Sequence, residues 1–254
     1  MLTAALTAVE TALATDGIAW LAVAAILAGL VRGFTGFGTA MVYLPIAGQF
    51  LPPVQALVTL ILIDFIGPMP AVPRAIREGH TRDVMRLVAG VLIGAPIGVA
   101  ILLLLPPDAF RAGVSLISLA LLAALISGVR YTGTVSRPMI YGIGGISGIL
   151  HGAAGLPGPP VILLYMARPL PVEVIRASVL LFLFLADILV MAIFGIRGLL
   201  DGPSLVLGLC LVPPYLAALM LGARLFHPRL ATVYRWAAYT IIAVSAISGL
   251  PIWS

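Results

Sequence analysis

The chain alternates between long apolar stretches and short polar connections that hold nearly all of its charges. Within each stretch the apolar residues run without alternation, which is typical of membrane-spanning helices and not of barrel strands. Because a lipid-exposed backbone must satisfy its own polar groups, the pattern predicts an all-α polytopic membrane protein. The eight expected segments are 18–48, 53–72, 84–105, 109–129, 138–167, 172–195, 203–223 and 236–252.

Two of these segments, 18–48 and 138–167, are longer than the others and are interrupted by glycine clusters. A straight helix over 18–48 would be about 46 Å long, whereas the hydrocarbon core of a bilayer is about 30 Å thick. We therefore expect each segment to break at its glycines into two shorter helices, which fold back within the membrane as a re-entrant hairpin.

The two glycine-rich segments also align with each other at an offset of 119 residues. The alignment places Gly29 on Gly148, Arg32 on His151, Gly33 on Gly152, Gly36 on Gly155 and Pro52 on Pro171. We expect two inverted repeats of about 120 residues, 18–129 and 138–254, each a broken or re-entrant segment followed by three transmembrane helices, the usual build of a secondary transporter. An N-terminal segment, 1–17, and a connecting loop, 130–137, complete the predicted organisation.

The arginines of the connections test this topology. The chain has no lysine, and if both glycine-rich segments are re-entrant, only Arg111 and Arg197 fall on one side of the membrane. Eleven arginines fall on the other side, as the positive-inside rule expects, whereas two single crossings leave no bias. A chain in which 18–48 crosses once and only 138–167 folds back gives the same split. The eleven are Arg74, Arg77, Arg82, Arg86, Arg130, Arg137, Arg168, Arg176, Arg224, Arg229 and Arg235.

With both segments re-entrant, each repeat crosses the membrane three times. Both termini then lie outside, and the odd number of crossings inverts the second repeat relative to the first. Arg168 and Arg176, which flank the entry to 172–195, are expected at the membrane interface.

Composition agrees with a membrane protein and excludes other classes. Only 9% of the residues are charged, against about 25% in a soluble domain. The net charge of +5 follows from the arginine distribution, so nucleic acid is not expected as a partner. The single cysteine, Cys210, lies in an apolar run, which leaves no disulfide framework and no cysteine metal motif. No cofactor or metal site is expected.

The tips of the expected hairpins carry the candidate chemistry. The second leg of each hairpin begins at the tip, where its free N–H groups and positive dipole end suit an anion. Glycine lets an oxyanion approach the backbone, although close helix packing is an alternative use of the same glycines. The candidate substrate-binding residues are Arg32, Gly33, Gly36, Phe37, Gly38, Thr39, His151, Gly152, Gly155, Leu156, Pro157 and Gly158.

Four ionisable residues lie deep inside apolar segments, away from the segment ends, where a charge is costly and is a functional candidate. Arg32 offers several donors to an oxyanion, or pairs with Asp64 or helix-end carbonyls. His151 binds an anion when protonated and responds to a proton gradient, or is a neutral hydrogen-bonded histidine. Asp64 and Asp187 are proton carriers or ion-pair partners of these bases. Thr39 is a candidate N-cap of the second leg. Packing is the expected or alternative role of Phe34, Phe37 and Met41.

One short motif points to an enzyme instead. The stretch Gly145-Ile146-Ser147-Gly148 matches the GxSG pattern of intramembrane serine proteases. That chemistry needs a histidine from another helix as the base, whereas His151 is four residues further along the same helix. We therefore expect no catalytic residue, and an intramembrane serine hydrolase is a remote alternative.

The glycine-rich stretches resemble a known family. GLVRGFTGFGTAMVYLPI at 29–46, followed by Pro52 and by LPGPPVILLY at 156–165, resembles the sulfite exporter TauE/SafE family from about Ile18 to Leu250. The resemblance implies a multi-pass carrier of the bacterial inner membrane for small anions, sulfite or organosulfonates among them, that forms a homodimer.

Together these features predict a secondary transporter of a small oxyanion. Access to a mid-membrane site would alternate as one part of the protein moves against the rest, with proton coupling through His151, Asp64 or Asp187. An anion channel of the same architecture is the main alternative, and a purely structural membrane subunit is another.

Overall fold

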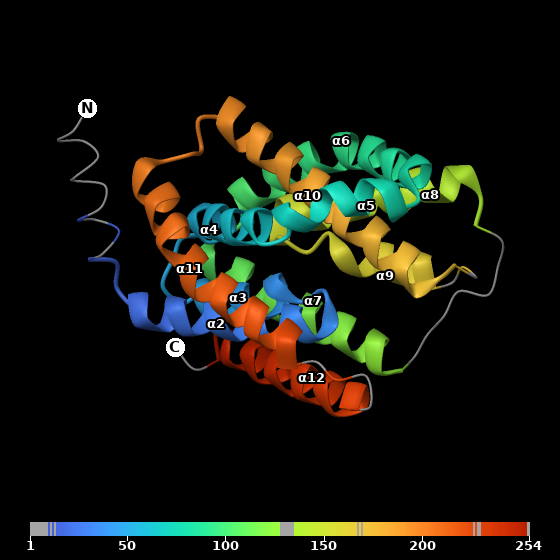
Figure 1. The fold of residues 1–254 in the computed structure, drawn as a ribbon. Helices are drawn as coiled ribbons and strands as arrows, with labels where there is room; N and C mark the ends of the chain where they lie inside the picture. The colour runs from blue at the N-terminus through green and yellow to red at the C-terminus, as the bar shows by residue number, and fades with distance from the viewer. Residues whose placement is uncertain are drawn as a thin grey trace. The chain divides into compact units, whose positions relative to one another are not determined.

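The computed structural model describes residues 14–127, 135–166, 170–225 and 230–252, together with residues 10, 12, 168 and 227. Most of the predicted N-terminal segment 1–17 and most of the loop 130–137 lie outside these residues. The named elements of the described part are all helical (Figure 1). They are α2 (Ile18–Thr35), α3 (Thr39–Ala47), α4 (Pro53–Ile66), η1 (Met69–Ala71), α5 (Val72–Glu78), α6 (Thr81–Leu104), α7 (Pro107–Ile126), α8 (Arg137–Ala154), α9 (Gly158–Met166), α10 (Val172–Ile196), α11 (Gly202–Leu225) and α12 (Ala231–Ser248).

Several of these helices are long and apolar enough to cross a bilayer, which confirms a helical membrane protein. In the described residues five helices meet this criterion, or six if α4 and the stretch from η1 to α5 form one span; the five are α2, α6, α7, α10 and α11. The first leg of segment 18–48, α2, meets this criterion, whereas the first leg of segment 138–167, α8, does not. The topology in which 18–48 crosses the membrane once and only 138–167 folds back therefore stays open. The inverted relation of the repeats also stays a prediction.

The segment expected at 53–72 is shorter than predicted, because α4 ends at Ile66. Pro68, Pro70 and Pro73 follow within seven residues. A proline has no N–H to donate and is accommodated best in the first turn of a helix. The chain therefore restarts twice, first as η1 and then as α5.

Both glycine-rich segments break where the sequence predicts. α2 and α8 each have 18 residues, α3 and α9 each have nine, and three residues separate the two legs in each segment. The first leg ends at Gly36 in one segment and at Gly155 in the other, with φ of 82° and 66°. Residues with a side chain rarely adopt this left-handed backbone conformation, whereas glycine does so easily. A glycine therefore ends both helices at equivalent positions.

The helices form two compact units, and each unit draws on both halves of the sequence. The first unit comprises 1–67, 106–122 and 194–254, and therefore contains α2, α3, α4, α11, α12 and most of α7. The second unit comprises 68–105 and 123–193, and contains α5, α6, α8, α9 and most of α10. The compact units are thus not the two sequence repeats.

In the first unit, α2 packs closely along α11 (Figure 1). A Cβ added at Gly29 would lie 2.5 Å from the carbonyl oxygen of Tyr215. A Cβ added at Gly33 would lie 2.6 Å from the carbonyl oxygen of Leu219. No real Cβ fits at such distances, so the two glycines allow the helix backbones to touch.

In the second unit, α8 packs along α6 through the matching glycines (Figure 1). A Cβ at Gly148 would lie 2.8 Å from the Cα of Val91, and a Cβ at Gly152 would lie 2.5 Å from the carbonyl oxygen of Ala95. Gly148 and Gly152 stand 119 residues after Gly29 and Gly33. The glycines at this offset therefore have the same local packing role in both units.

Candidate functional site

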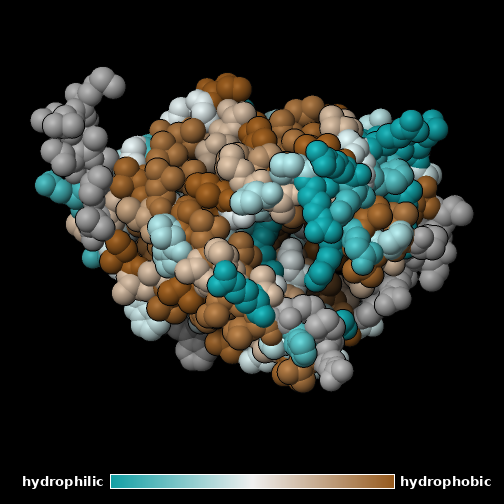
Figure 2. All heavy atoms as spheres, viewed as in Figure 1, coloured by the Kyte–Doolittle hydropathy of each residue, from teal (hydrophilic) through white to brown (hydrophobic). Residues whose placement is uncertain are grey.

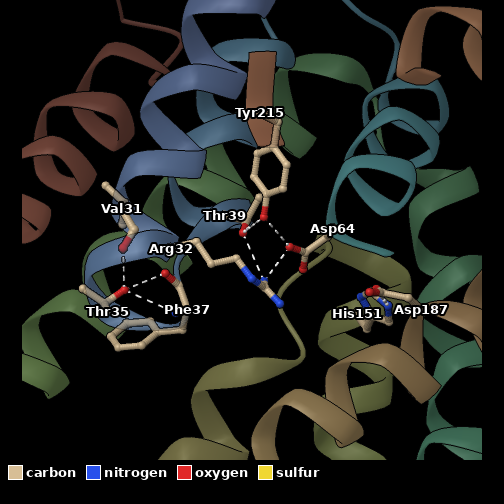
Figure 3. A network of polar contacts seen from close by, with 9 residues as sticks. All are labelled: Val31, Arg32, Thr35, Phe37, Thr39, Asp64, His151, Asp187 and Tyr215. Carbon is tan, nitrogen blue, oxygen red and sulfur yellow. Dashed lines mark hydrogen bonds and ion pairs between the residues drawn. The ribbon is translucent and has the colours of Figure 1, made fainter. Parts of the chain in front are cut away.

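Arg32 lies at the centre of a buried polar cluster in the first unit. It is in the last turn of α2, and its side chain is only 7% exposed. One terminal nitrogen donates to Oδ1 of Asp64 at 2.5 Å and to Oγ1 of Thr39 at 3.1 Å. Asp64 comes from α4, and Thr39 is the first residue of α3. The cluster therefore ties both legs of the first hairpin to the next helix (Figure 3).

Tyr215 of α11 completes this cluster and was not predicted from the sequence. Its ring is fully buried, and its hydroxyl lies 3.3 Å from Oδ1 of Asp64 and 3.3 Å from Oγ1 of Thr39. A buried tyrosine hydroxyl usually finds a hydrogen-bond partner. The signal that could have found it is its place inside an apolar segment, away from the segment ends where interfacial aromatics gather.

The Arg32–Asp64 pair is electrically neutral as a whole. Removing one partner of a buried ion pair leaves an uncompensated charge and costs about 3–5 kcal/mol. Of the two roles predicted for Asp64, the structure shows the ion-pair role, while proton transfer stays a prediction. The predicted capping role of Thr39 is wrong, because Gly38 is the N-cap of α3 and the Thr39 hydroxyl instead contacts Arg32 and Tyr215.

The tip of the first hairpin is rich in backbone donors. α3 begins after Gly38, whose φ is 96°, and no side chain caps this end. Thr35 ties the turn together, because its hydroxyl donates to the Val31 carbonyl at 2.8 Å and accepts from the Phe37 N–H at 3.2 Å. The first N–H groups of a helix have no partner within the helix, and Thr39, the first residue of α3, contacts Arg32 through its side chain.

His151 and Asp187 form the corresponding pair in the second unit. His151 on α8 is 1% exposed, and its Nε2 lies 3.1 Å from Oδ1 of Asp187 on α10. In the described part of the chain neither Nδ1 nor Nε2 of His151 makes a hydrogen bond of acceptable geometry, so the contact with Asp187 is a close approach of the two side chains. His151 aligns with Arg32, whereas Asp187 lies about one helical turn beyond the position that aligns with Asp64. Both units therefore pair the base before the break with an acid from the helix after the hairpin.

The tip of the second hairpin offers fewer donors than the first. The Leu156 N–H already donates to the Leu150 carbonyl at 3.2 Å. Pro157, Pro159 and Pro160 have no N–H at all, so Gly158 supplies the only amide hydrogen among residues 157–160. The prolines do suit a first helical turn, as the sequence predicts, but they remove donors that an anion would use.

The remaining candidates divide between tip and packing positions. Gly36 and Gly155 end the first legs, and nothing lies within 4 Å of a Cβ added at Gly36. Gly33 and Gly152 instead face the neighbouring helices described above. Phe34 stacks on Tyr234 with ring centroids 5.0 Å apart. Met41 is buried.

Ser147 does not form the hydrogen bond that a serine nucleophile needs. Its side chain is buried on α8, one turn before His151. Among the described residues its Oγ has no hydrogen-bond partner, His151 included.

The described residues also contain no group of three or more His, Cys, Asp or Glu side chains that could hold a metal ion.

Comparisons with known proteins show which family the chain belongs to. The sequence profile described as "Sulfite exporter TauE/SafE" matches residues 21–249, and that range includes both hairpins and both ion pairs. A protein of Cupriavidus necator, described as a probable sulfite/organosulfonate exporter TauE, is 28% identical over 232 residues, which cover 85% of this chain and 88% of that protein. No solved structure gives a significant match. The chain therefore belongs to the sulfite exporter TauE/SafE family of membrane transporters.

Proposed function

We propose that the protein is a secondary transporter that exports a small oxyanion, sulfite or an organosulfonate, across the bacterial inner membrane. The family and the description of the Cupriavidus relative support this substrate class. We further propose a homodimer of chains with two inverted repeats, in which access to the substrate alternates between the two sides of the membrane.

The observation that carries the proposal is the buried Arg32–Asp64 pair beside the uncapped start of α3. A guanidinium can donate several hydrogen bonds to the oxygen atoms of an oxyanion. The N–H groups of Thr39 and Ala40 add a second set of donors and a positive dipole end. In the proposed site the oxyanion replaces the Asp64 carboxylate as the partner of Arg32.

This exchange suggests how protons take part. An oxyanion and an ionised Asp64 repel each other when both face Arg32, because like charges at this distance disfavour ionisation. A proton on Asp64 removes the repulsion and lets the anion bind. The His151–Asp187 pair of the second unit is the second proposed proton carrier, since an imidazole changes its charge within the physiological pH range.

Flux measured in proteoliposomes tests the proposal. We expect Arg32→Ala combined with Asp64→Ala, which leaves no unpaired buried charge, to lower sulfite flux by about tenfold or more, because a hydrogen bond to a charged group contributes about 1.5–3 kcal/mol. Arg197→Ala is the matched control, since Arg197 is an exposed arginine of the first unit. Unchanged flux in the double variant would remove Arg32 from the substrate site.

The same vesicles distinguish a transporter from a channel. A transporter with a site that must be refilled saturates with sulfite, and a trapped pH dye reports protons that move with the anion. Flux that neither saturates nor responds to a pH gradient would favour an anion channel.

A further inference from the structure

A second charged cluster, apart from the two ion pairs above, surrounds Asp83 in the second unit. Asp83 lies in the first turn of α6 and is 1% exposed. Its Oδ1 accepts from Arg86 at 2.6 Å, and its Oδ2 accepts from Arg168. Nδ1 of His80 lies 3.1 Å from the same Oδ2. One buried carboxylate thus fixes two guanidinium groups and lies beside one imidazole.

This cluster has more positive charge than its acid can balance. Asp83 supplies one negative charge, whereas Arg86 and Arg168 supply two positive charges that ordinary pH does not remove. Their side chains are 25% and 22% exposed, so each arginine remains partly accessible while the carboxylate holds its guanidinium in position. A fixed pair of guanidinium groups with excess charge is a preorganised partner for a phosphate group.

Further arginines extend the cluster along the same end of the second unit. The His80 N–H donates to Oγ of Ser178 at 2.8 Å, which fixes the start of α6 against the first turns of α10. Arg82 on α6 is two residues after His80, Arg176 on α10 is two residues before Ser178, and both arginines are exposed. Hydrophilic residues gather over the region of α5, as comparison of Figure 2 with Figure 1 shows. α5 directly precedes His80 and α6 in the chain.

The arginines are interleaved with exposed apolar side chains. Ile76 on α5 is 53% exposed, Met85 on α6 is 54% exposed and Val172 on α10 is 63% exposed. Each lies within about one turn of an exposed arginine on the same helix. Basic groups beside apolar ones are typical of the layer where lipid headgroups meet acyl chains, and a site for a free inorganic anion does not need the apolar part.

We propose that the arginine cluster anchored by Asp83 binds the headgroup phosphate of an anionic phospholipid. Arg86 and Arg168 contact the phosphate, Arg82 and Arg176 add attraction, and the acyl chains of the lipid lie against the apolar side chains named above. Asp83 is a positioning residue in this site because it holds the two guanidinium groups without touching the lipid. The site does not depend on the proposed substrate or on the direction of transport.

Binding of a fluorescent phosphatidylglycerol to the full chain in phosphatidylcholine nanodiscs tests the proposal. We expect saturable binding that Arg82→Gln with Arg176→Gln weakens by about twentyfold or more, because each basic residue near an anionic lipid contributes about fivefold. These two exposed residues leave the Asp83 ion pairs intact, so the variant should stay folded. Arg197→Gln with Arg224→Gln removes the same charge from exposed positions of the first unit and should leave binding unchanged.

Three results would overturn the proposal. Binding that the two double variants weaken equally would show general surface charge and no site. Competition by inorganic phosphate or sulfite at concentrations similar to the lipid would show a site for soluble anions. Unaltered binding in the Arg82→Gln and Arg176→Gln variant would place the lipid elsewhere.

Discussion

In the first unit a guanidinium lies before the helix break, whereas the second unit has an imidazole at the aligned position. The backbones of the two hairpins match, with legs of 18 and nine residues and a glycine in the left-handed conformation after each first leg. A guanidinium such as that of Arg32 keeps its charge at any physiological pH, whereas an imidazole such as that of His151 can be charged or neutral within this range. One scaffold therefore holds a permanent cation in one unit and a titratable group in the other.

The two tips also differ in the number of backbone N–H groups that they offer to an anion. The first tip has the N–H groups of Thr39 and Ala40 beside Arg32, whereas prolines replace most of the donors at the second tip. Anion binding thus fits the first hairpin better than the second, and proton transfer fits the second pair. Similar glycine packing in both units allows this divergence, because the glycines that contact the neighbouring helices are separate from the residues at the tips.

Removal of the acids should give the largest difference between the units. We expect Asp64→Asn to destabilise the protein by about 3–5 kcal/mol, because it leaves the Arg32 guanidinium buried without its counter-ion. Asp187→Asn should cost only about 1–3 kcal/mol, because an imidazole, unlike a guanidinium, can give up its charge when its partner is lost. Thermal unfolding in detergent at neutral pH measures both. Equal losses would contradict a difference in charge state between the two pairs.

A compensating variant separates charge from shape in this comparison. Arg32→Gln added to Asp64→Asn should recover much of the lost stability, because no uncompensated charge then remains buried. If the double variant is as unstable as Asp64→Asn alone, the loss comes from hydrogen bonding and not from charge.

Overpacking at the helix contacts should affect both units alike. Gly33→Val and Gly152→Val should each lower stability by about 1–3 kcal/mol, because the new side chains would meet backbone atoms of α11 and α6. Gly142→Ala on α8 is the control: nothing lies within 4 Å of the added Cβ, and alanine favours the helix. Loss of stability in one unit only would show that the two contacts are not equivalent.

Tyr215→Phe should have a smaller effect, confined to the first pair. The variant removes a hydroxyl that contacts Asp64 and Thr39, and a hydrogen bond of this kind contributes about 0.5–1.5 kcal/mol. Because the ring remains, we expect a few-fold rise in the half-saturating sulfite concentration with little change in unfolding temperature. A lower unfolding temperature with unchanged half-saturation would indicate a structural role alone.

The smallest expected change in stability comes from His151→Gln. This variant tests the difference between the two units through the pH dependence of sulfite flux. The amide keeps a hydrogen-bonding group near Asp187 but does not titrate between pH 5 and 8. Sulfite flux measured across this range should therefore lose part of its pH dependence, while Tyr215→Phe keeps it. A profile that matches the parent protein would remove His151 from proton coupling.

Much of the fold follows from the sequence, because hydrophobic length and glycine position act locally. The breaks after α2 and α8 were predicted from apolar runs too long for one crossing. The pairing of α2 with α11 and of α8 with α6 was not predictable, since it depends on contacts between distant helices. At the site, Arg32 and Asp64 stood out as charges in apolar segments. Tyr215 also lies inside an apolar segment, but its place there says nothing about which residues its hydroxyl contacts, because α11 is distant from Arg32 and Asp64 in the sequence.

The exchange of helices between the halves of the chain has a consequence for biogenesis. The partner of α2 along its glycine face is not synthesised until residue 202, long after α2 itself leaves the ribosome. Neither half of the chain contains both helices of either glycine contact, so half-chains expressed alone should be rapidly degraded, and co-expressed halves should rescue each other. If the two halves arose by duplication of the predicted repeat, an ancestor with one copy would have had to assemble from two chains to make the same contacts.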